Sequence, residues 1–186
     1  MTAIVAVRKG KKAVIASDSL TSFGRQHVSE QNYSSTKIRK IGNSYVALSG
    51  YSLYKNILDD YLKDRRAVKL NTKEEIYRFV LKFWKELKDN YTFVNNQSNS
   101  KYHPFADLNS SFLVLNKNGI FTVSGNMTVT KFKQYYSIGS GSDYCMGAMH
   151  SLYDSDMSAK QIARAAIGAS ITFDPYCGGK IRVKQL

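Results

Sequence analysis

The chain has 186 residues, 43% of them hydrophobic, which suffices for one sizeable core, yet no apolar run approaches the ~20 residues of a membrane span. Lys and Arg outnumber Asp and Glu by 27 to 14, but these charges are dispersed and form no nucleic-acid-binding module, so nucleic acid is not expected as a partner. Two cysteines are too few for a disulfide framework, which favours a reducing cytoplasm, and three scattered histidines form no metal-ligand pattern. The length of the chain favours one domain over residues 1–186.

Threonine stands at position 2, just ahead of the strand-like residues Ala3 to Val7. Removal of Met1 would free the α-amino group of Thr2. An α-amine has a pKa of about 7.7 to 8.0 and can take the proton of the hydroxyl on the same residue. The sequence therefore predicts an N-terminal nucleophile. Because the chain begins Met-Thr, we expect methionine removal to be the only processing that Thr2 needs.

The first strand should fold back on itself as a hairpin. Alternating valines flank Gly10-Lys11, and a two-residue turn with glycine first is typical of type II′. If the lysines on either side of this turn pair, Asp18 lies opposite Ala3 and within a residue of Thr2. Strict alternation would put Asp18 on the face of Ala3, so we expect a bulge or an intermediary group between Asp18 and Thr2.

The rest of the chain alternates groups of strands and helices, with capping boxes at Thr72/Glu75 and Ser158/Gln161. This order predicts an α+β fold, a four-layer αββα sandwich of two antiparallel sheets flanked by helix pairs. The expected elements are strands at 20–28, 36–41 and 45–49, helices at 52–63 and from 72, a polar loop at 90–109, strands at 111–116, 120–124 and up to 139, helices at 141–152 and from 158, and a strand at 180–184.

Each predicted helix carries an apolar stripe at helical spacing that should face the core. The strongest stripe belongs to the second helix. The expected stripes are Leu53, Ile57, Leu58, Tyr61 and Leu62; Ile76, Phe79, Val80, Phe83, Trp84 and Leu87; Tyr144, Ala148, Met149 and Leu152; and Ile162, Ala165, Ala166 and Ala169.

With these features, the chain resembles the β-type subunits of proteasomes, which belong to the N-terminal nucleophile hydrolase superfamily. Within that group it is similar to the bacterial peptidase HslV and to bacterial proteasome homologues. The resemblance spans nearly the whole chain and is carried by Thr2 to Gly10, Val14 to Ser19 and Ile138 to Tyr144. It implies the αββα fold of these hydrolases and peptide cleavage through an acyl-enzyme on the threonine.

The resemblance also implies a role for each residue expected around the nucleophile. Thr2 matches the nucleophile itself, and Lys37 and Asp18 match the lysine and carboxylate that adjust the proton affinity of its hydroxyl. Ser140 matches the serine that hydrogen-bonds the terminal amine, and Asp174 matches the carboxylate near that amine. By sequence alone, an ordinary helix cap would be the preferred interpretation of Gly139-Ser140-Gly141.

The oxyanion donor implied by the resemblance is the backbone amide of Gly50, with Ser49 as the alternative. Relatives of the HslV type have a second glycine after this position, where this chain has Tyr51. The shape of the pocket should therefore differ from theirs.

The turn from Asp174 to Gly179 resembles the Asp-x-x-Ser-Gly-Gly turn of proteasome β subunits, with Cys177 in place of the serine. A thiol is a weaker donor than a hydroxyl, so the hydrogen bonds that orient the amine should be looser. No cofactor is expected to be required. The resemblance does imply a structural monovalent or divalent cation, for which the backbone carbonyls of Gly168, Ile171 and Asp174 are the candidates.

The leading hypothesis is a threonine endopeptidase that forms a homo-oligomeric double ring, with six or seven subunits per ring, and cuts unfolded polypeptides. The resemblance implies an unfoldase ATPase as a partner. Two alternatives stay open from the residues alone. One is an N-terminal nucleophile amidase acting on non-peptide amides, and the other is a non-catalytic ring scaffold that retains Met1 and binds nucleic acid.

Overall fold

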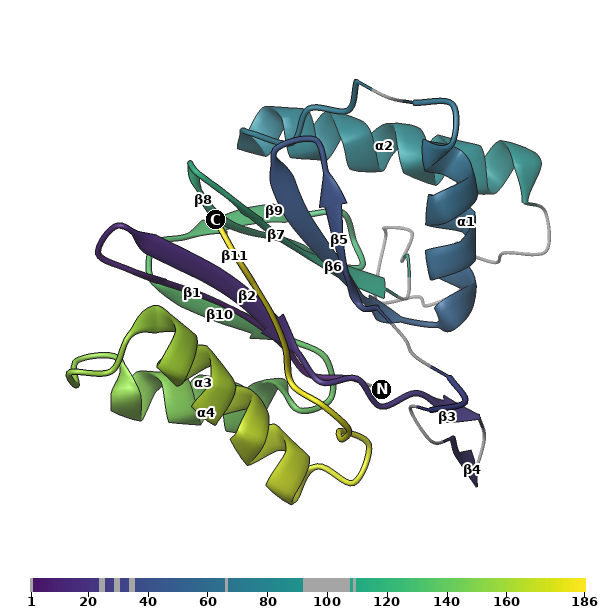
Figure 1. Cartoon of the computed structure of the whole chain (residues 1–186). Helices are drawn as coiled ribbons and strands as arrows, with labels where there is room; N and C mark the ends of the chain where they lie inside the picture. The colour runs from purple at the N-terminus through teal and green to yellow at the C-terminus, as the bar shows by residue number, and fades with distance from the viewer. Residues whose placement is uncertain are drawn as a thin grey trace, which may run out of the picture.

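The computed structural model describes residues 2–23, 26–28, 31–33, 36–65, 67–91, 108 and 110–186. Two antiparallel sheets lie face to face, and a pair of helices covers the outer face of each (Figure 1). This arrangement is the predicted α+β fold, a four-layer αββα sandwich.

The first sheet has the strand order β10-β1-β2-β11, formed by Tyr135–Ile138, Ile4–Lys9, Lys12–Ser17 and Arg182–Gln185. Its hairpin has the predicted register, with Lys9 paired to Lys12. The first strand, β1, is central in the sheet and its apolar residues are fully buried. Thr2 is therefore positioned by a buried central strand that begins two residues after it.

Helices α3 (Ser142–Leu152) and α4 (Ala159–Phe173) cover the outer face of this sheet (Figure 1). The predicted capping box of α4 is present, with Ser158 and Gln161 each bonding the other's backbone amide. The expected inward position of Tyr144 was wrong, because Cys145 and Met149 form the buried row of α3 instead. Tyr144 is 45% exposed and packs on the outside of the molecule.

The second sheet has the order β5-β6-β7-β8-β9, formed by Ile38–Ile41, Ser44–Gly50, Ser110–Asn116, Gly119–Val123 and Val129–Phe132. The short edge strand β9 was not predicted from the sequence. Apolar side chains from the facing sides of the two sheets form one core cluster between them.

Helices α1 (Ser52–Leu62) and α2 (Lys73–Asn90) cover the outer face of the second sheet. Thr72 caps α2, because its hydroxyl accepts a hydrogen bond from the Glu75 amide, but only this half of the predicted capping box is formed, since the Glu75 carboxylate accepts from the Asn71 amide at 2.7 Å. The predicted stripe of α1 was wrong at one position. Leu53 is 41% exposed, and Tyr54 is buried in its place because it lies one turn before Ile57 and Leu58.

The segment predicted as one strand at 20–28 contains the short strands β3 (Ser22–Phe23) and β4 (Gln26–His27), which pair with each other. Of the polar loop predicted at 90–109, residues 92–107 and 109 lie outside the described part of the chain. Across the described ranges, no helix is long and apolar enough to cross a bilayer.

Candidate active site

Thr2 lies two residues before β1 and is buried, with 4% of its surface exposed. Its carbonyl oxygen accepts a hydrogen bond from the Gly141 amide at 3.3 Å, and the next carbonyl, of Ala3, accepts from the Asp18 amide at 3.2 Å. The start of α3 and the end of β2 thus hold the backbone of Thr2 from two sides.

The close approach of the β10–α3 connection to Thr2 depends on glycine. Gly139 has a φ of 103°, and a Cβ atom added there would lie 2.1 Å from the carbonyl oxygen of Thr2. Gly141 occupies the N-cap position of α3, and no side chain caps that helix. Ser140 therefore does not cap α3, which was the alternative interpretation of Gly139-Ser140-Gly141.

Gly139→Ala is expected to lower the free energy of unfolding by about 3 kcal/mol or more, because it combines a steric clash with a strained φ. Gly147→Ala is the matched control. A Cβ there meets nothing within 4 Å, and alanine favours a helix by roughly 0.5–1 kcal/mol. Denaturant titration measures both variants, and equal stabilities would contradict the assigned role of Gly139.

The Asp18 carboxylate is fully buried and receives four hydrogen bonds. Its Oδ1 atom accepts from the Thr2 hydroxyl at 2.9 Å, from the Ala3 amide at 3.0 Å and from Lys37 Nζ at 2.6 Å. Its Oδ2 atom accepts from the Gly178 amide at 3.1 Å. Four donors, one of them a cation, compensate for the burial of this carboxylate.

The contact between Asp18 and Thr2 is direct, so the expectation of a bulge or an intermediary group was wrong. Asp18 lies one residue beyond Ser17, the last residue of β2. Side chains alternate strictly between the two faces only within a strand. The orientation of the last strand residue, Ser17, therefore does not fix the orientation of Asp18, which follows it.

Lys37 lies immediately before β5, and its side chain is 10% exposed. Burial lowers its pKa below the usual range, although the charge and hydrogen bond of Asp18 and the nearby Cys177 act in the opposite direction. The ammonium therefore gives up its proton more readily than a free lysine does. It shares the Oδ1 atom of Asp18 with the Thr2 hydroxyl, which places a cation beside the candidate nucleophile.

Ser140 and Asp174 lie on the nitrogen side of Thr2. The backbone nitrogen of Thr2 donates to Ser140 Oγ at 3.2 Å, and the Ser140 hydroxyl in turn donates to the carbonyl oxygen of Thr2 at 3.4 Å. Burial raises the pKa of Asp174, but hydrogen bonds from the Tyr176 amide, Ser140 and Cys177 together outweigh it and lower that pKa. An ionised carboxylate near the nitrogen would stabilise an ammonium group there.

Cys177 supports this arrangement as a neutral thiol. Its Sγ atom donates to Asp174 Oδ2 at 3.2 Å and lies 4.0 Å from Ser140 Oγ. The pKa of the thiol is raised to about 12, and burial is the largest cause. The hydrogen bond to Asp174 and the charges of Asp18 and Asp174 act in the same direction. Cys177 is therefore a donor to Asp174 and not a second nucleophile, since the thiolate is the reactive form.

Cys177→Ala is expected to lower stability by roughly 1–3 kcal/mol, because Asp174 Oδ2 loses its thiol donor in a buried site. Cys177→Ser should stay close to the parent, since a hydroxyl replaces the thiol as donor. The hydrogen bonds lower the pKa of Asp174, so their stabilisation is present above the carboxyl's unfolded pKa and is lost as pH falls through the folded one. Thermal unfolding as a function of pH measures this, and identical curves for the alanine and serine variants would refute it.

Gly50 is the last residue of β6 and has a φ of 141°. The hydroxyl of Ser110 donates to the carbonyl of Ser49 at 2.8 Å, which fixes the strand end beside β7. Tyr51, at the place of the second glycine in HslV-type chains, is the N-cap residue of α1 and is 72% exposed. The role of Gly50 as oxyanion donor stays a prediction.

The three carbonyls expected to hold a cation lie along the end of α4. That of Gly168 accepts from the Thr172 hydroxyl at 3.0 Å, and that of Asp174 accepts from the Cys177 amide at 3.0 Å. Each carbonyl oxygen has a second lone pair, and the carboxyl end of a helix favours cations, so the residues fit such a role. Within the described ranges, no group of three or more His, Cys, Asp or Glu side chains could hold a metal ion. The cation site stays a prediction.

The backbone donors to Asp18, which are the amides of Ala3 and Gly178, were not predicted from the sequence. The turn around Gly178 is clamped to the end of β2, because its carbonyl accepts from the amides of Ser19 and Leu20 at 3.1 and 2.9 Å. A Cβ at Gly178 would come within 3.2 Å of the Leu20 side chain. The glycine pair at 178–179 was the available signal for this close approach.

An αββα sandwich with a buried threonine at the start of a central strand is the architecture of the N-terminal nucleophile hydrolases. The family profile described as "Proteasome subunit" matches residues 2–186, and the chain belongs to this family. One curated relative is "ATP-dependent protease subunit HslV" of Ligilactobacillus salivarius (strain UCC118). It is 26% identical over 190 residues, which cover 100% of this chain and 99% of that protein.

Solved structures give the same picture. Thiobacillus denitrificans BPH is 28% identical, with a TM-score of 0.88 over 99% of this chain and 97% of that one. The same protein in complex with epoxomicin has a TM-score of 0.87 at the same identity and coverage. HslV from Trypanosoma brucei, 18% identical, has a TM-score of 0.68 over 99% of this chain and 98% of that one, and supports the fold alone.

Proposed function

We propose that this chain is a threonine endopeptidase subunit whose nucleophile is the hydroxyl of Thr2, exposed for catalysis by removal of Met1. The proposal rests mainly on one acceptor atom, Asp18 Oδ1, which the Thr2 hydroxyl and the Lys37 ammonium share. Asp18 Oδ1 binds both the Thr2 hydroxyl, at 2.9 Å, and Lys37 Nζ, at 2.6 Å, in a buried environment. Membership of the proteasome subunit family supports the same activity.

In the proposed reaction, Met1 must be removed because an amide nitrogen is not a base at neutral pH. The freed amine of Thr2 takes the hydroxyl proton, and Oγ1 attacks the peptide carbonyl carbon. The oxyanion that forms is stabilised by a backbone amide, for which Gly50 is the candidate. The ammonium returns its proton to the leaving nitrogen as the peptide bond breaks, which leaves an ester on Thr2.

Water completes the cycle. The amine of Thr2 takes a proton from the water, the resulting hydroxide attacks the ester carbonyl, and the carboxylic acid product leaves as Oγ1 regains its proton. Lys37 supplies positive charge near Oγ1 throughout. Ser140 and Asp174 hold the amine in position, since Ser140 already bonds the Thr2 nitrogen at 3.2 Å.

The proposed assembly is a homo-oligomeric double ring with six or seven subunits per ring, acting on unfolded polypeptides in the cytoplasm. The name of the Ligilactobacillus relative, an ATP-dependent protease subunit, supports an ATPase partner. Both cysteines are free and buried, as suits a reducing compartment.

Incubation of the purified protein with unfolded casein tests the proposal, with light scattering to measure the mass of the assembly. We expect a ring-sized particle that degrades casein and is inhibited by epoxomicin, the ligand of the Thiobacillus homologue. A ring that has lost Met1 but cleaves neither casein nor short peptides would refute the peptidase. Cleavage of non-peptide amides alone would favour the amidase, and salt-dependent binding of nucleic acid by an inactive ring would favour the scaffold.

A further inference from the structure

Lysines that are scattered along the sequence come together at one end of the sandwich. The β5–β6 and β7–β8 turns are neighbours there because Tyr45 pairs with Leu115, and β9 ends beside the start of β8 because Phe132 pairs with Ile120. Figure 1 shows the β1–β2 turn at the far end of the sandwich from the N-terminus. Six exposed lysines in or next to the β1–β2, β5–β6, β7–β8 and β9–β10 turns form a surface that we call the basic end: Lys11, Lys12, Lys40, Lys117, Lys131 and Lys133.

Arg8 holds three of these turns together. Its backbone amide donates to the carbonyl of Gln134 at 2.6 Å, and its guanidinium donates to the carbonyl of Lys117 at 2.9 Å. The first bond joins β1 to the β9–β10 turn, and the second joins the first sheet to the second. The lysines of different hairpins therefore belong to one fixed surface and not to independent loops.

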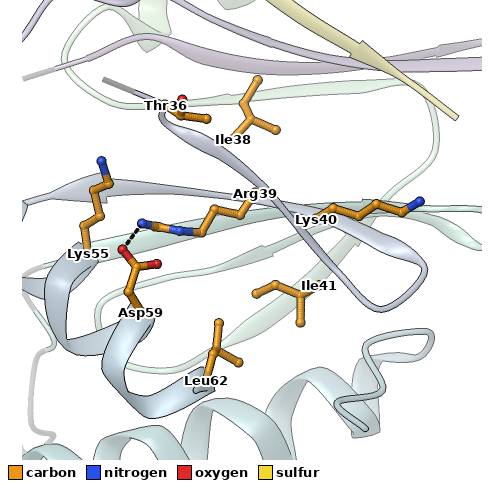
Figure 2. Close-up of a pocket in the computed structure, with 8 residues that line it drawn as sticks. All are labelled: Thr36, Ile38, Arg39, Lys40, Ile41, Lys55, Asp59 and Leu62. Atoms are coloured by element: carbon orange, nitrogen blue, oxygen red, sulfur yellow. Dashed lines mark hydrogen bonds and ion pairs between the residues drawn. The ribbon is translucent and has the colours of Figure 1, made fainter. Parts of the chain in front are cut away.

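The basic end lacks compensating acidic side chains. Among the residues that the structure describes, no carboxylate forms an ion pair with any of the six lysines, although Asp154 and Asp156 lie in the α3–α4 connection next to the end of β1. On β5, Arg39 pairs with Asp59, whereas Lys40 extends away from that pair (Figure 2). No Asp or Glu occurs in the segments that form the four turns, which are residues 8–13, 40–45, 116–120 and 131–136. Like charges gathered in this way repel one another, and an anionic ligand would relieve the repulsion.

We infer that the basic end binds an acidic segment of a partner polypeptide. The surface lies at the opposite end of β1 from Thr2, roughly 20 Å away at ~3.3 Å per strand residue, so this binding goes beyond the proposed active site. A lysine ammonium is a point charge on a flexible stem, which suits the carboxylates of an extended acidic chain.

The same surface is less suited to nucleic acid. Within the four turn segments, all of which the structure describes, no aromatic side chain is exposed on which a base could stack. Arginine is the residue that best matches phosphate geometry, and the one arginine of these segments, Arg8, directs its guanidinium at a backbone carbonyl.

Fluorescence anisotropy of a labelled peptide of alternating glutamate and glycine tests the inference on the assembled Thr2→Ala protein, in which the peptide is not cut. We expect the peptide to bind with an affinity that falls as salt is added, and a glutamine–glycine peptide of the same length not to bind. Lys11→Glu combined with Lys133→Glu should weaken binding by about tenfold or more, because two hairpins of the basic end then repel the peptide.

Lys82→Glu combined with Lys85→Glu is the matched control. Both lysines are exposed on α2, and the change in net charge is the same. Affinity for the glutamate peptide should stay within about twofold of the value without these changes. With Thr2 intact, Lys11→Glu combined with Lys133→Glu should leave cleavage of a short neutral fluorogenic peptide at the parental rate, since the basic end is remote from the candidate active site.

Absence of binding by the glutamate peptide, or equal weakening by the two pairs of changes, would overturn the inference while the peptidase stands. Duplex DNA that binds more tightly than the glutamate peptide at the same salt, and that loses affinity with Lys11→Glu and Lys133→Glu, would assign the basic end to nucleic acid and overturn the choice of a polypeptide. Binding as expected in a protein whose parent form cleaves no peptide would overturn the proposed function and leave the binding surface in place.

Discussion

Thr2→Ala is expected to reduce peptide cleavage by about 10⁴-fold or more, as loss of the nucleophile does in other hydrolases that form an acyl-enzyme. The fold should survive the change. Asp18 keeps its bonds from the Ala3 amide, Lys37 and the Gly178 amide when the hydroxyl is gone. Initial rates on a fluorogenic peptide, together with the mass of the assembly, measure the effect.

Thr2→Ser is the matched control, because serine keeps both the hydroxyl and the α-amine after methionine removal. Its activity should stay within about tenfold of the parent, since nucleophile and base are both retained. An alanine variant as active as the serine variant would place the nucleophile elsewhere in the protein.

Asp18→Ala is expected to lower the free energy of unfolding by about 3–5 kcal/mol and to abolish cleavage, because it leaves the Lys37 ammonium buried without its carboxylate. Asp60→Ala is the control. It breaks the Lys63–Asp60 pair, whose side chains are 71% and 53% exposed, and pairs of that kind contribute about 1 kcal/mol or less. Chemical denaturation of both variants measures the difference, and similar losses would contradict the structural role of Asp18.

The stability of Asp18→Ala should also depend on pH with a defined sign. Asp18 raises the pKa of Lys37 against the effect of burial, so its removal lowers that pKa further. The unfolded chain then binds the proton more tightly than the folded one. The loss in free energy of unfolding caused by Asp18→Ala should therefore shrink as the pH rises through the lowered pKa of Lys37 in the folded protein. Adding Lys37→Met should recover part of the stability at neutral pH, because no buried charge is left unpaired.

Turn and capping patterns in the sequence were sufficient to predict much of the framework that positions the site. A glycine-first turn flanked by lysines determined the register of the β1–β2 hairpin, and that register brought Asp18 to the end of the chain. The Thr72 cap and the capping box at Ser158 and Gln161 located the starts of α2 and α4. The fold class followed from the order of elements and from the family resemblance.

The errors have physical causes that the sequence does not display. Leu53 and Tyr144 were assigned to the predicted stripes because they are large and apolar. In the packed helices the residues that follow them, Tyr54 and Cys145, face the sheets instead. β9 has four residues, too few for a reliable alternation pattern. The donors of Ala3 and Gly178 to Asp18 are backbone amides, which every residue but proline has, so only the fold reveals them.

The intact mass of the assembled protein, measured before and after reaction with a threonine-directed electrophile, tests the central claim most directly. We predict a chain lighter than the translated sequence by ~131 Da, one methionine residue, because the mechanism requires a free amine on Thr2. One adduct per chain should form and should map to Thr2. Full peptidase activity in a chain that retains Met1, or an adduct that maps to another residue, would contradict the account.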